Sequence, residues 1–521
     1  MEIELKLALP PQQAAAFLKR MARRRSVPVR QDLVTRYFDT PDFALSARGV
    51  ALRVRRTLQG TSTLKGTSTL KGTRAGRRWL QTLKTEGERQ GGLSRRVEFE
   101  MPVPGGAPDW TRFPPAALAY VPESQRDLIV PVFETRFHRT AWLLKGKGGA
   151  QIEVALDVGE VVSGERSQPI CEIELELKAG QPDALFALAL EWAGAFDCLP
   201  FDVSKAERGV RLAHGVESAP VKSVRLALDD GMSVEEGFEA IVQACLAQLQ
   251  ANLPGVLASD DIEYVHQARV ALRRLRAALR LYRTVCVLPD DLLAGLRTLT
   301  AALGPARDWD VLCGETLPAI APHHPDAAVW QRGMQALERH RIAVRAAMRE
   351  ALAGARPGAW LLALQRWLMQ HGWRVQPSGH PAPEAQCVAQ LAPLDAWARR
   401  ALRRGHRVLV RGAREFGTLA PAQRHLLRIA IKRQRYAAEF FQTLFDGKRQ
   451  VRYLAALRLA QDSLGRANDA HIASVLLSAA QVETGPMREF ALGWLAATQA
   501  ETANGACARR MRAFLELKPY W

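Results

Sequence analysis

Carboxylates and an ammonium group alternate with apolar residues at the start of the chain, Met1-Glu-Ile-Glu-Leu-Lys6. Residues two apart lie on the same face of a β-strand, so this spacing predicts a strand with Glu2, Glu4 and Lys6 side by side. Carboxylate oxygens bind hard divalent cations, and an ammonium group binds phosphoryl oxygens. The segment therefore carries the groups that a metal–phosphate complex requires.

Later segments before residue 215 repeat this alternation. The residues on their shared faces are Arg53 and Arg55, Thr82 and Lys84, Arg96, Glu98 and Glu100, Glu153, Ala155 and Asp157, and Glu172, Glu174 and Glu176. The ordinary interpretation is a sheet with one dry and one solvated face. Like carboxylates in a row repel unless a cation joins them, so these charged faces favour a sheet closed around a charged lumen. There Arg and Lys would bind phosphate, and clustered Glu would bind Mg²⁺ or Mn²⁺.

The elements that would position these residues change character near residue 215. Before it, short alternating runs separated by Gly and Pro predict strands. After about Ser233, apolar residues three and four apart predict helices. We therefore expect an α+β multidomain protein: a β domain over residues 1–215, a linker over 216–232 with a strand-like Val224–Leu228, and a helical domain over 233–515.

The bulk composition narrows the class of ligand and the cellular compartment. A chain of 521 residues exceeds one ordinary core, and a formal net charge of +19 favours polyanionic ligands. Seven scattered cysteines without a C-x-x-C pair fit a reducing cytosol and argue against a structural zinc site. The start has no signal-peptide pattern, and no stretch approaches 18 uncharged apolar residues. We therefore expect a cytoplasmic protein without a membrane span.

Two internal repeats have different meanings. Residues 61–72 duplicate Thr-Ser-Thr-Leu-Lys-Gly, which we interpret as a solvated hairpin loop. The second repeat is long-range: the pattern of His266–Arg276 recurs 159 residues later at His425–Arg435, and that of 303–308 recurs 161 residues later at 464–469. Two matches at nearly one offset indicate two homologous helical units.

Each helical unit would carry a basic stripe that begins with a histidine. Its members are His266, Arg269, Arg273, Arg274 and Arg276 in the first unit and His425, Arg428, Lys432, Arg433 and Arg435 in the second. A solvated basic face is the ordinary interpretation of one such helix. Like charges three and four residues apart destabilise a helix unless an anion neutralises them, and the stripe occurs twice. We therefore predict an anion site.

The β half resembles a known family. Glu2-Ile-Glu-Leu-Lys6 resembles the E-x-E-x-K signature that opens the CYTH superfamily, the triphosphate tunnel metalloenzymes, and the resemblance runs through residues 1–212. Its further landmarks are Tyr37-Phe-Asp-Thr-Pro41, the strands with Arg53/Arg55 and Thr82/Lys84, Arg96–Glu100, Arg136/Arg139, Ile152–Asp157, Glu172/Glu174/Glu176 and Ser204–Gly209. The resemblance implies an eight-stranded antiparallel tunnel barrel with flanking helices that binds triphosphate with a divalent metal and hydrolyses it.

The resemblance also implies roles for single residues. Glu2, Glu4, Glu172 and Glu174 would be metal ligands for Mg²⁺ or Mn²⁺. Lys6, Arg53, Arg55, Lys84, Arg139 and Lys205 would bind the triphosphate. Glu2, Glu4, Lys6 and Lys205 would form the catalytic set.

The helical half resembles the CHAD domain, an all-α module of two four-helix repeats that binds polyphosphate. The repeats would cover about 233–375 and 384–515, and the two basic stripes would face each other across a groove. By this resemblance long-chain polyphosphate is the partner, and the protein would associate with polyphosphate granules. Asp308, Asp310 and Asp469 would orient basic side chains rather than bind metal.

Together these observations predict a metal-dependent inorganic triphosphatase that cleaves tripolyphosphate to pyrophosphate and phosphate. Two alternatives stay open: a non-catalytic polyphosphate-binding scaffold, and an enzyme that acts on nucleoside or thiamine triphosphate. Nucleic acid is a less favoured partner, because no DNA- or RNA-binding motif is present and the stripes lack aromatic residues for base stacking.

Overall fold

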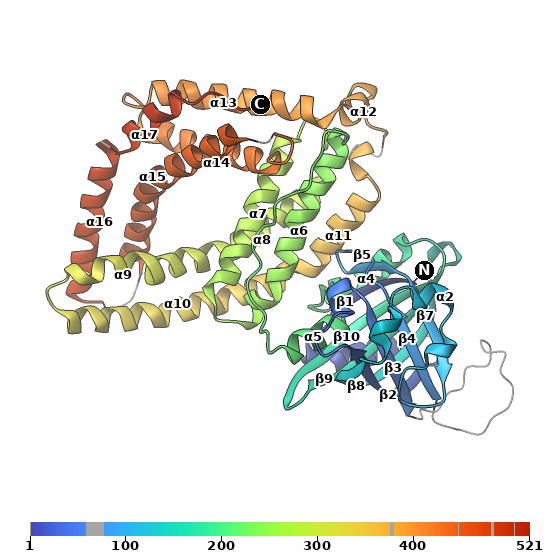
Figure 1. Ribbon diagram of the computed structural model, residues 1–521. Helices are drawn as coiled ribbons and strands as arrows, with labels where there is room; N and C mark the ends of the chain where they lie inside the picture. The colour runs from blue at the N-terminus through green and yellow to red at the C-terminus, as the bar shows by residue number, and fades with distance from the viewer. Residues whose placement is uncertain are drawn as a thin grey trace. The chain divides into compact units, whose positions relative to one another are not determined.

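The computed structural model describes residues 2–24, 26–58, 78–375, 380–445, 447–480, 484–504 and 506–521. The duplicated segment 61–72, which we expect to be a hairpin loop, lies outside these ranges. The chain forms two compact units, one of residues 1–219 with 356–366 and one of residues 220–355 with 367–521 (Figure 1).

The first unit is built on one antiparallel sheet, which confirms the predicted β domain. Eight strands have six or more residues: β1 (Glu2–Ala8), β2 (Val29–Asp39), β3 (Ala51–Leu58), β4 (Arg78–Lys84), β7 (Glu98–Val103), β8 (Val130–Lys145), β9 (Gln151–Ser163) and β10 (Arg166–Ala179). Three shorter strands are β5 (Glu88–Gln90), β6 (Leu93–Arg96) and β11 (Leu199–Pro200). The pairing order is β5-β6-β1-β10-β9-β8-β2-β3-β4-β7, and β11 pairs with β1.

Apolar residues of the alternating strands form the core outside the curled sheet. Leu5, Leu7, Ile173 and Leu175 are fully buried, since α4 (Asp183–Ala195) packs on β1 and β10. Beside them Phe17 of α1 (Ala14–Met21) meets the ring of Trp192 edge-on at 5.2 Å. The opposite face of the same strands is left to the charged residues. Two further short helices are α2 (Pro115–Leu118) and α3 (Glu123–Arg126).

A segment from the distant helix α11 (Pro357–Met369) belongs to the first unit. Arg366 donates hydrogen bonds of 2.6 and 2.7 Å to Asp183 on α4, and Arg356 donates one of 2.5 Å to Asp197. Gly358 packs against the backbone of Cys198, where a Cβ would lie 1.9 Å from the carbonyl oxygen. The sequence division at residues 215–232 does not include this segment, because its contacts join positions that are far apart in the chain.

The second unit is helical and contains two sets of four long helices, as predicted. The first set is α6 (Val234–Ala258), α7 (Ile262–Leu281), α8 (Asp290–Val311) and α10 (Ala327–Ala355). The second set is α13 (Leu394–Arg414), α14 (Pro421–Phe440), α15 (Lys448–Ala479) and α16 (Pro486–Asn504). Shorter helices are α9 (Leu317–Ile320), α12 (Glu384–Gln390) and α17 (Ala506–Leu515).

The expected linker is partly built into the second unit. Its strand-like residues 224–228 form no strand, so that expectation is wrong. Leu226 and Leu228 are instead buried, and the backbone N–H and C=O of Leu228 hydrogen-bond to the Thr443 hydroxyl at 3.0 and 2.7 Å. The side chain of Thr443, in the turn after α14, therefore satisfies the backbone that a neighbouring strand would otherwise pair.

Within the described ranges, α6 is the one helix whose length and composition would suffice to cross a membrane. Just over half (56%) of its most apolar stretch is buried inside the structure. Core helices pass the same test, so this is weak evidence for a span.

Candidate functional site

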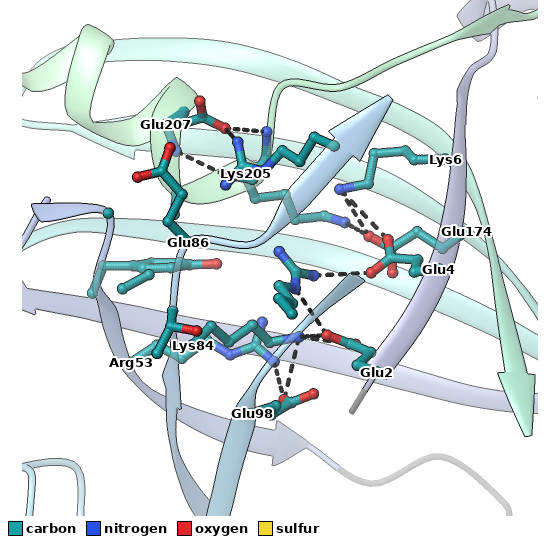
Figure 2. Close-up of a pocket in the computed structure, with 18 of the residues that line it drawn as sticks. Glu2, Glu4, Lys6, Arg53, Lys84, Glu86, Glu98, Glu174, Lys205 and Glu207 are labelled. Carbon is teal, nitrogen blue, oxygen red and sulfur yellow. Dashed lines mark hydrogen bonds and ion pairs between the residues drawn. The ribbon is translucent and has the colours of Figure 1, made fainter. Parts of the chain in front are cut away.

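The charged faces of the sheet enclose a cavity of about 780 Å³ (Figure 2). Each of the strands β1 to β10 contributes at least one residue to its lining, and α5 (Lys205–Ala213) adds one more wall. Of the residues predicted to bind metal or triphosphate, the wall contains Glu2, Glu4, Lys6, Arg53, Arg55, Lys84, Arg139, Glu174 and Lys205. Glu172 lies directly behind Lys205, within ion-pair distance of its ammonium group.

The strand register brings opposite charges together on the inner face. Lys6 pairs across the strands with Glu174, and Lys84 pairs with Glu98. Directly opposite residues share a face, so each cation lies beside a carboxylate. On β10, Glu172 and Glu174 are tolerated side by side because Lys6 and Lys205 lie within ion-pair distance of both. Glu176 pairs with Lys178 of the same strand.

Glu2 is held by two cations, Arg96 from the neighbouring strand β6 and Lys84 from the distant strand β4. Its carboxylate accepts hydrogen bonds of 2.9 and 3.0 Å from Lys84 Nζ and one of 2.9 Å from Arg96 Nε (Figure 2). Burial alone would raise the pKa of Glu2, but the charges of Lys84 and Arg96 outweigh it and lower the pKa. Glu2 is therefore ionised at neutral pH.

Glu4 has an oxygen without a hydrogen-bond partner in the described chain. Oε2 accepts a hydrogen bond of 2.9 Å from Arg96, whereas Oε1 is buried without a hydrogen-bond partner and lies 3.6 Å from Lys6 Nζ. Burial and the neighbouring carboxylate of Glu174 raise the pKa of Glu4. An orphaned carboxylate oxygen beside a like charge fits a divalent cation, which would relieve both costs.

Lys205, the first residue of α5, lies among three carboxylates. Its ammonium donates hydrogen bonds to Asp157 (2.7 Å), Glu174 (2.8 Å) and Glu172. Oxygens of these three carboxylates lie within 4.8 Å of one another, a grouping that could hold a metal ion. Burial opposes the charge on Lys205, but the carboxylates prevail and raise its pKa. The helix start is fixed by a capping box between Ser204 and Glu207.

The opposite wall carries positive charge in excess. Burial and the adjacent guanidinium groups of Arg53 and Arg139 lower the pKa of Arg55 to about 10. The Nε atoms of Arg53 and Arg55 are buried without hydrogen-bond partners. Burial and the charges of Arg53 and Arg96 likewise lower the pKa of Lys84. Such a cluster is stabilised by an anion, and a phosphate chain supplies one.

A second cavity, of about 560 Å³, lies in the helical unit. Its basic wall is formed by both predicted stripes, with His266, Arg269 and Arg273 from α7 and Arg428 and Lys432 from α14. The stripes of the two repeats therefore face one site, as expected. Arg307 and Asp308 of α8 and Asp469 of α15 complete its rim.

Comparison with known proteins identifies both halves. Residues 1–210 match the family model of the CYTH domain, and residues 240–478 match that of the CHAD domain. The chain is a CYTH domain joined to a CHAD domain.

Two relatives illustrate the match. An inorganic triphosphatase from Haemophilus influenzae is 32% identical over 225 residues, which are 40% of this chain and 54% of that protein. The chain thus spans about half the length of this curated relative. The crystal structure of the CHAD domain from the plant Ricinus communis aligns with 58% of this chain and 99% of that one, at 32% identity and a TM-score of 0.51.

Some charged residues of the CYTH domain lie elsewhere than on the cavity wall. Arg136 pairs with Glu134 at 2.7 Å and is not on the wall, because it is three residues from Arg139 on β8 and therefore points to the other face of the sheet. Asp157 forms ion pairs with both Arg139 and Lys205, and its place in the sequence does not predict that role.

Tyr37 is a cavity residue to which the sequence pattern assigns no role. Its ring stacks on Phe133 at 4.5 Å, and it lines the cavity beside Arg53. Burial would raise the pKa of Tyr37, but Arg53 and Lys205 lower it. Its position within Tyr37-Phe-Asp-Thr-Pro41 is the one signal that could have pointed to it. Three further lining residues, Glu86, Arg89 and Glu207, were likewise not predicted.

In the CHAD domain five predicted binding residues do not line the cavity. Arg274 is buried between Glu439, at 3.7 Å, and the ring of Phe440, so the structure contradicts its predicted contact with polyphosphate. Arg435 pairs with Glu439 at 2.7 Å. Arg276, His425 and Arg433 are exposed away from the cavity wall. The helical period explains Arg274 and Arg433, because each directly follows a cavity residue, Arg273 or Lys432, and so points about 100° away from it. Arg276, His425 and Arg435 lie on the same helix faces as the cavity residues but are not part of its wall.

The aspartates behave as expected where the structure describes their partners. Asp308 lies 3.8 Å from Arg269 at the cavity rim. Asp310 is fully buried, accepting hydrogen bonds from Arg341 (2.7 Å) and Arg345 (3.2 Å). Both therefore orient arginines. On the opposite wall burial and the charges of Arg428 and Arg273 lower the pKa of Lys432 to about 8.

Proposed function

We propose that the CYTH domain hydrolyses inorganic tripolyphosphate to pyrophosphate and phosphate, with Mg²⁺ or Mn²⁺ as cofactor. The observation that carries this proposal is the arrangement of the 780 Å³ cavity, where the incompletely paired cations Arg53 and Arg55 face a wall with the orphaned oxygen of Glu4. In a metal–triphosphate complex, the metal ion would neutralise the carboxylates and the phosphates would neutralise the arginines. The inorganic triphosphatase from Haemophilus influenzae supports the choice of substrate.

The cations of the cavity would bind and align the substrate. Arg53, Arg55 and Arg139 present planar guanidinium groups that can bind phosphoryl oxygens through two hydrogen bonds each. Lys84 adds a point charge near Arg53, and Lys6 adds one on β1 beside Glu4 and Glu174. Phosphoryl transfer depends mainly on positioning and on electrostatic stabilisation of the phosphoryl oxygens, so this alignment is the main contribution of the chain.

Glu2, Glu4, Glu172 and Glu174 would hold the cation. Glu4 and Glu172 fit best because each keeps one buried oxygen without a hydrogen-bond partner, and of the two Glu4 lines the cavity. Both oxygens of Glu2, by contrast, accept hydrogen bonds from Lys84. A bound divalent cation would neutralise charge on the phosphoryl group and favour formation of a nucleophilic water.

The test is release of phosphate from tripolyphosphate by the intact chain, with and without Mg²⁺ or Mn²⁺, in a panel that includes ATP and thiamine triphosphate. We expect tripolyphosphate to be the preferred substrate. Glu4→Gln should raise the metal concentration for half-maximal activity by at least about tenfold, a typical size for lost metal-site interactions. Glu123→Gln, an exposed glutamate on α3, is the matched control. Unchanged metal dependence in Glu4→Gln would exclude Glu4 as a ligand.

One observation favours a second candidate, a CYTH domain that binds phosphate chains without cleaving them. Lys205 already neutralises Asp157, Glu172 and Glu174, the group of carboxylates that could hold a metal. This scaffold would bind tripolyphosphate without turning over any triphosphate of the panel.

We further propose that the CHAD domain binds long-chain polyphosphate in its 560 Å³ cavity and that the protein resides in the cytoplasm with polyphosphate granules. The support is the convergence of both basic stripes on one site. Replacing Arg273 and Lys432 together with Gln should weaken polyphosphate binding at least about tenfold, since each lost phosphate contact removes counterion release.

A further inference from the structure

Helix α13 carries a row of exposed arginines that is separate from both cavities. The row, called here the α13 arginine stripe, consists of Arg400, Arg403, Arg404, Arg407, Arg411 and Arg414. At about 100° per residue the six fall within an arc of about 100°, and at about 1.5 Å per residue they extend over about 21 Å. None of them lines the CHAD cavity. The stripe is therefore a continuous positive edge on the helical unit.

The charge of the stripe is not neutralised by the protein. Within the described ranges none of the six arginines forms an ion pair with a carboxylate; Asp395, the single acidic residue of α13, pairs with Arg399 instead, at 3.8 Å. Arginines three and four residues apart repel one another along a helix. A bound polyanion would remove this repulsion.

The first repeat shows that the stripe is not a requirement of the fold. The helix that occupies the same place there, α6, has 25 residues without a single Lys or Arg, whereas α13 has seven arginines in 21 residues. Each helix directly precedes, along the chain, the helix whose basic residues line the CHAD cavity: α6 precedes α7, and α13 precedes α14. The charge is thus a property of the second repeat alone.

Two alternative ligands fit the stripe less well. A membrane-bound amphipathic helix needs a free apolar face, but the apolar residues Leu394, Leu402 and Leu409 of α13 are buried in the protein. Sequence-specific nucleic-acid binding needs side chains that read or stack on bases. The arc presents guanidinium groups without exposed aromatic rings, so it offers groups that bind phosphate but none that stack on bases.

We propose that the α13 arginine stripe is a second, outer binding site for long-chain polyphosphate. The inference rests on the proposed polyphosphate-binding function of the CHAD domain. A linear phosphate polymer matches a straight row of guanidinium groups, and a chain held in the cavity and on the stripe together binds more tightly than at either site. Short chains cannot use both sites, so the stripe selects for polymer length.

The test compares binding of long-chain polyphosphate and tripolyphosphate to the full chain at several salt concentrations. One variant replaces Arg400, Arg404, Arg407 and Arg411 with Gln. The control replaces four exposed arginines elsewhere in the unit, Arg297, Arg332, Arg339 and Arg452, with Gln, which removes the same charge. The stripe variant should lose at least about tenfold in affinity for the long chain, and the slope of log K against log salt should fall by roughly 3.

Each outcome separates the stripe from the cavity. Equal affinities of the stripe variant and its control would overturn the proposal, as would a loss that is confined to duplex DNA or equally large for tripolyphosphate. If the Arg273/Lys432 variant binds normally while the stripe variant does not, the proposed cavity site fails and the stripe stands. A wild-type chain that does not bind long polyphosphate refutes both. Circular dichroism of each variant verifies that the helices are intact.

Discussion

Lys84 on β4 donates hydrogen bonds of 2.9 and 3.0 Å to Glu2 on β1, although five strands lie between β1 and β4 in the order of the sheet. A flat sheet would place these strands far apart, since neighbouring strands are about 4.8 Å from each other. The contact therefore shows that the sheet curls until its ends face each other. That curl turns charged strand faces into the walls of one cavity.

Replacement of Lys84 tests the cation wall. Lys84→Gln should lower kcat/KM for tripolyphosphate on the order of 10²-fold, a typical cost of removing one donor that stabilises a charged transition state. Steady-state phosphate release is the measurement. Lys145→Gln, an exposed lysine on β8, is the matched control. Equal activity of both variants would show that Lys84 holds Glu2 and does not bind phosphate.

Replacement of Lys205 tests whether the carboxylate group can accept a metal. Lys205→Ala leaves Asp157, Glu172 and Glu174 buried without their shared cation, which should destabilise the CYTH domain by about 3–5 kcal/mol. Mn²⁺ should then raise the melting temperature of Lys205→Ala more than that of the wild type. Lys205→Arg, which keeps the charge, should show no such gain. A metal response identical in all three proteins would contradict the assignment.

Polyphosphate binding to the CHAD domain should depend on pH through Lys432. Its pKa is lowered to about 8, so the side chain is charged below that pH and neutral above it. The anion binds the charged form, and affinity should therefore fall as the pH rises through about 8. The unfolded chain keeps this proton up to its ordinary pKa of 10.5, so stability should rise between these values.

The matched variant for this pH dependence is Lys432→Arg, which remains charged throughout the range. Its affinity should stay constant where that of the wild type falls, whereas Lys432→Gln should bind weakly at every pH. Calorimetric titration with long-chain polyphosphate between pH 7 and pH 9 provides the comparison. A wild-type affinity that is flat across this range would refute the role of Lys432.

Gly358 should be essential for the attachment of segment 356–366 to the CYTH domain. A Cβ there would meet the Cys198 carbonyl oxygen at 1.9 Å, so Gly358→Ala forces the two backbones apart. Gly354→Ala is the matched control, because a Cβ at that helical position meets nothing within 4 Å. We expect Gly358→Ala to lower the melting temperature by several degrees and Gly354→Ala to leave it unchanged or raise it, as Ala favours helix. Similar melting temperatures would show that the contact is dispensable.

Nine of the ten residues predicted to bind metal or triphosphate line one cavity. Seven of them follow from side-chain alternation, because the period of two in a strand assigns each residue to a face regardless of the partner strand. Arg139 and Lys205 came from the family resemblance instead, and Lys205 lies on a helix. Arg274 in the CHAD domain shows the limit of such reasoning. Its spacing from neighbouring arginines looks functional, but only packing against Glu439 and Phe440 reveals that it is buried.

The sequence by itself thus determined which faces are charged and that a β part is followed by a helical part, because these depend on local periodicity and composition. The tertiary structure decided which charges meet. The contact of Lys84 with Glu2, the enclosure of Lys205 by three carboxylates and the attachment of Gly358 to Cys198 join residues that are far apart in the chain. Strand register, sheet curl and helix packing set those distances. These features depend on contacts between segments, so the residue spacing within one segment does not predict them.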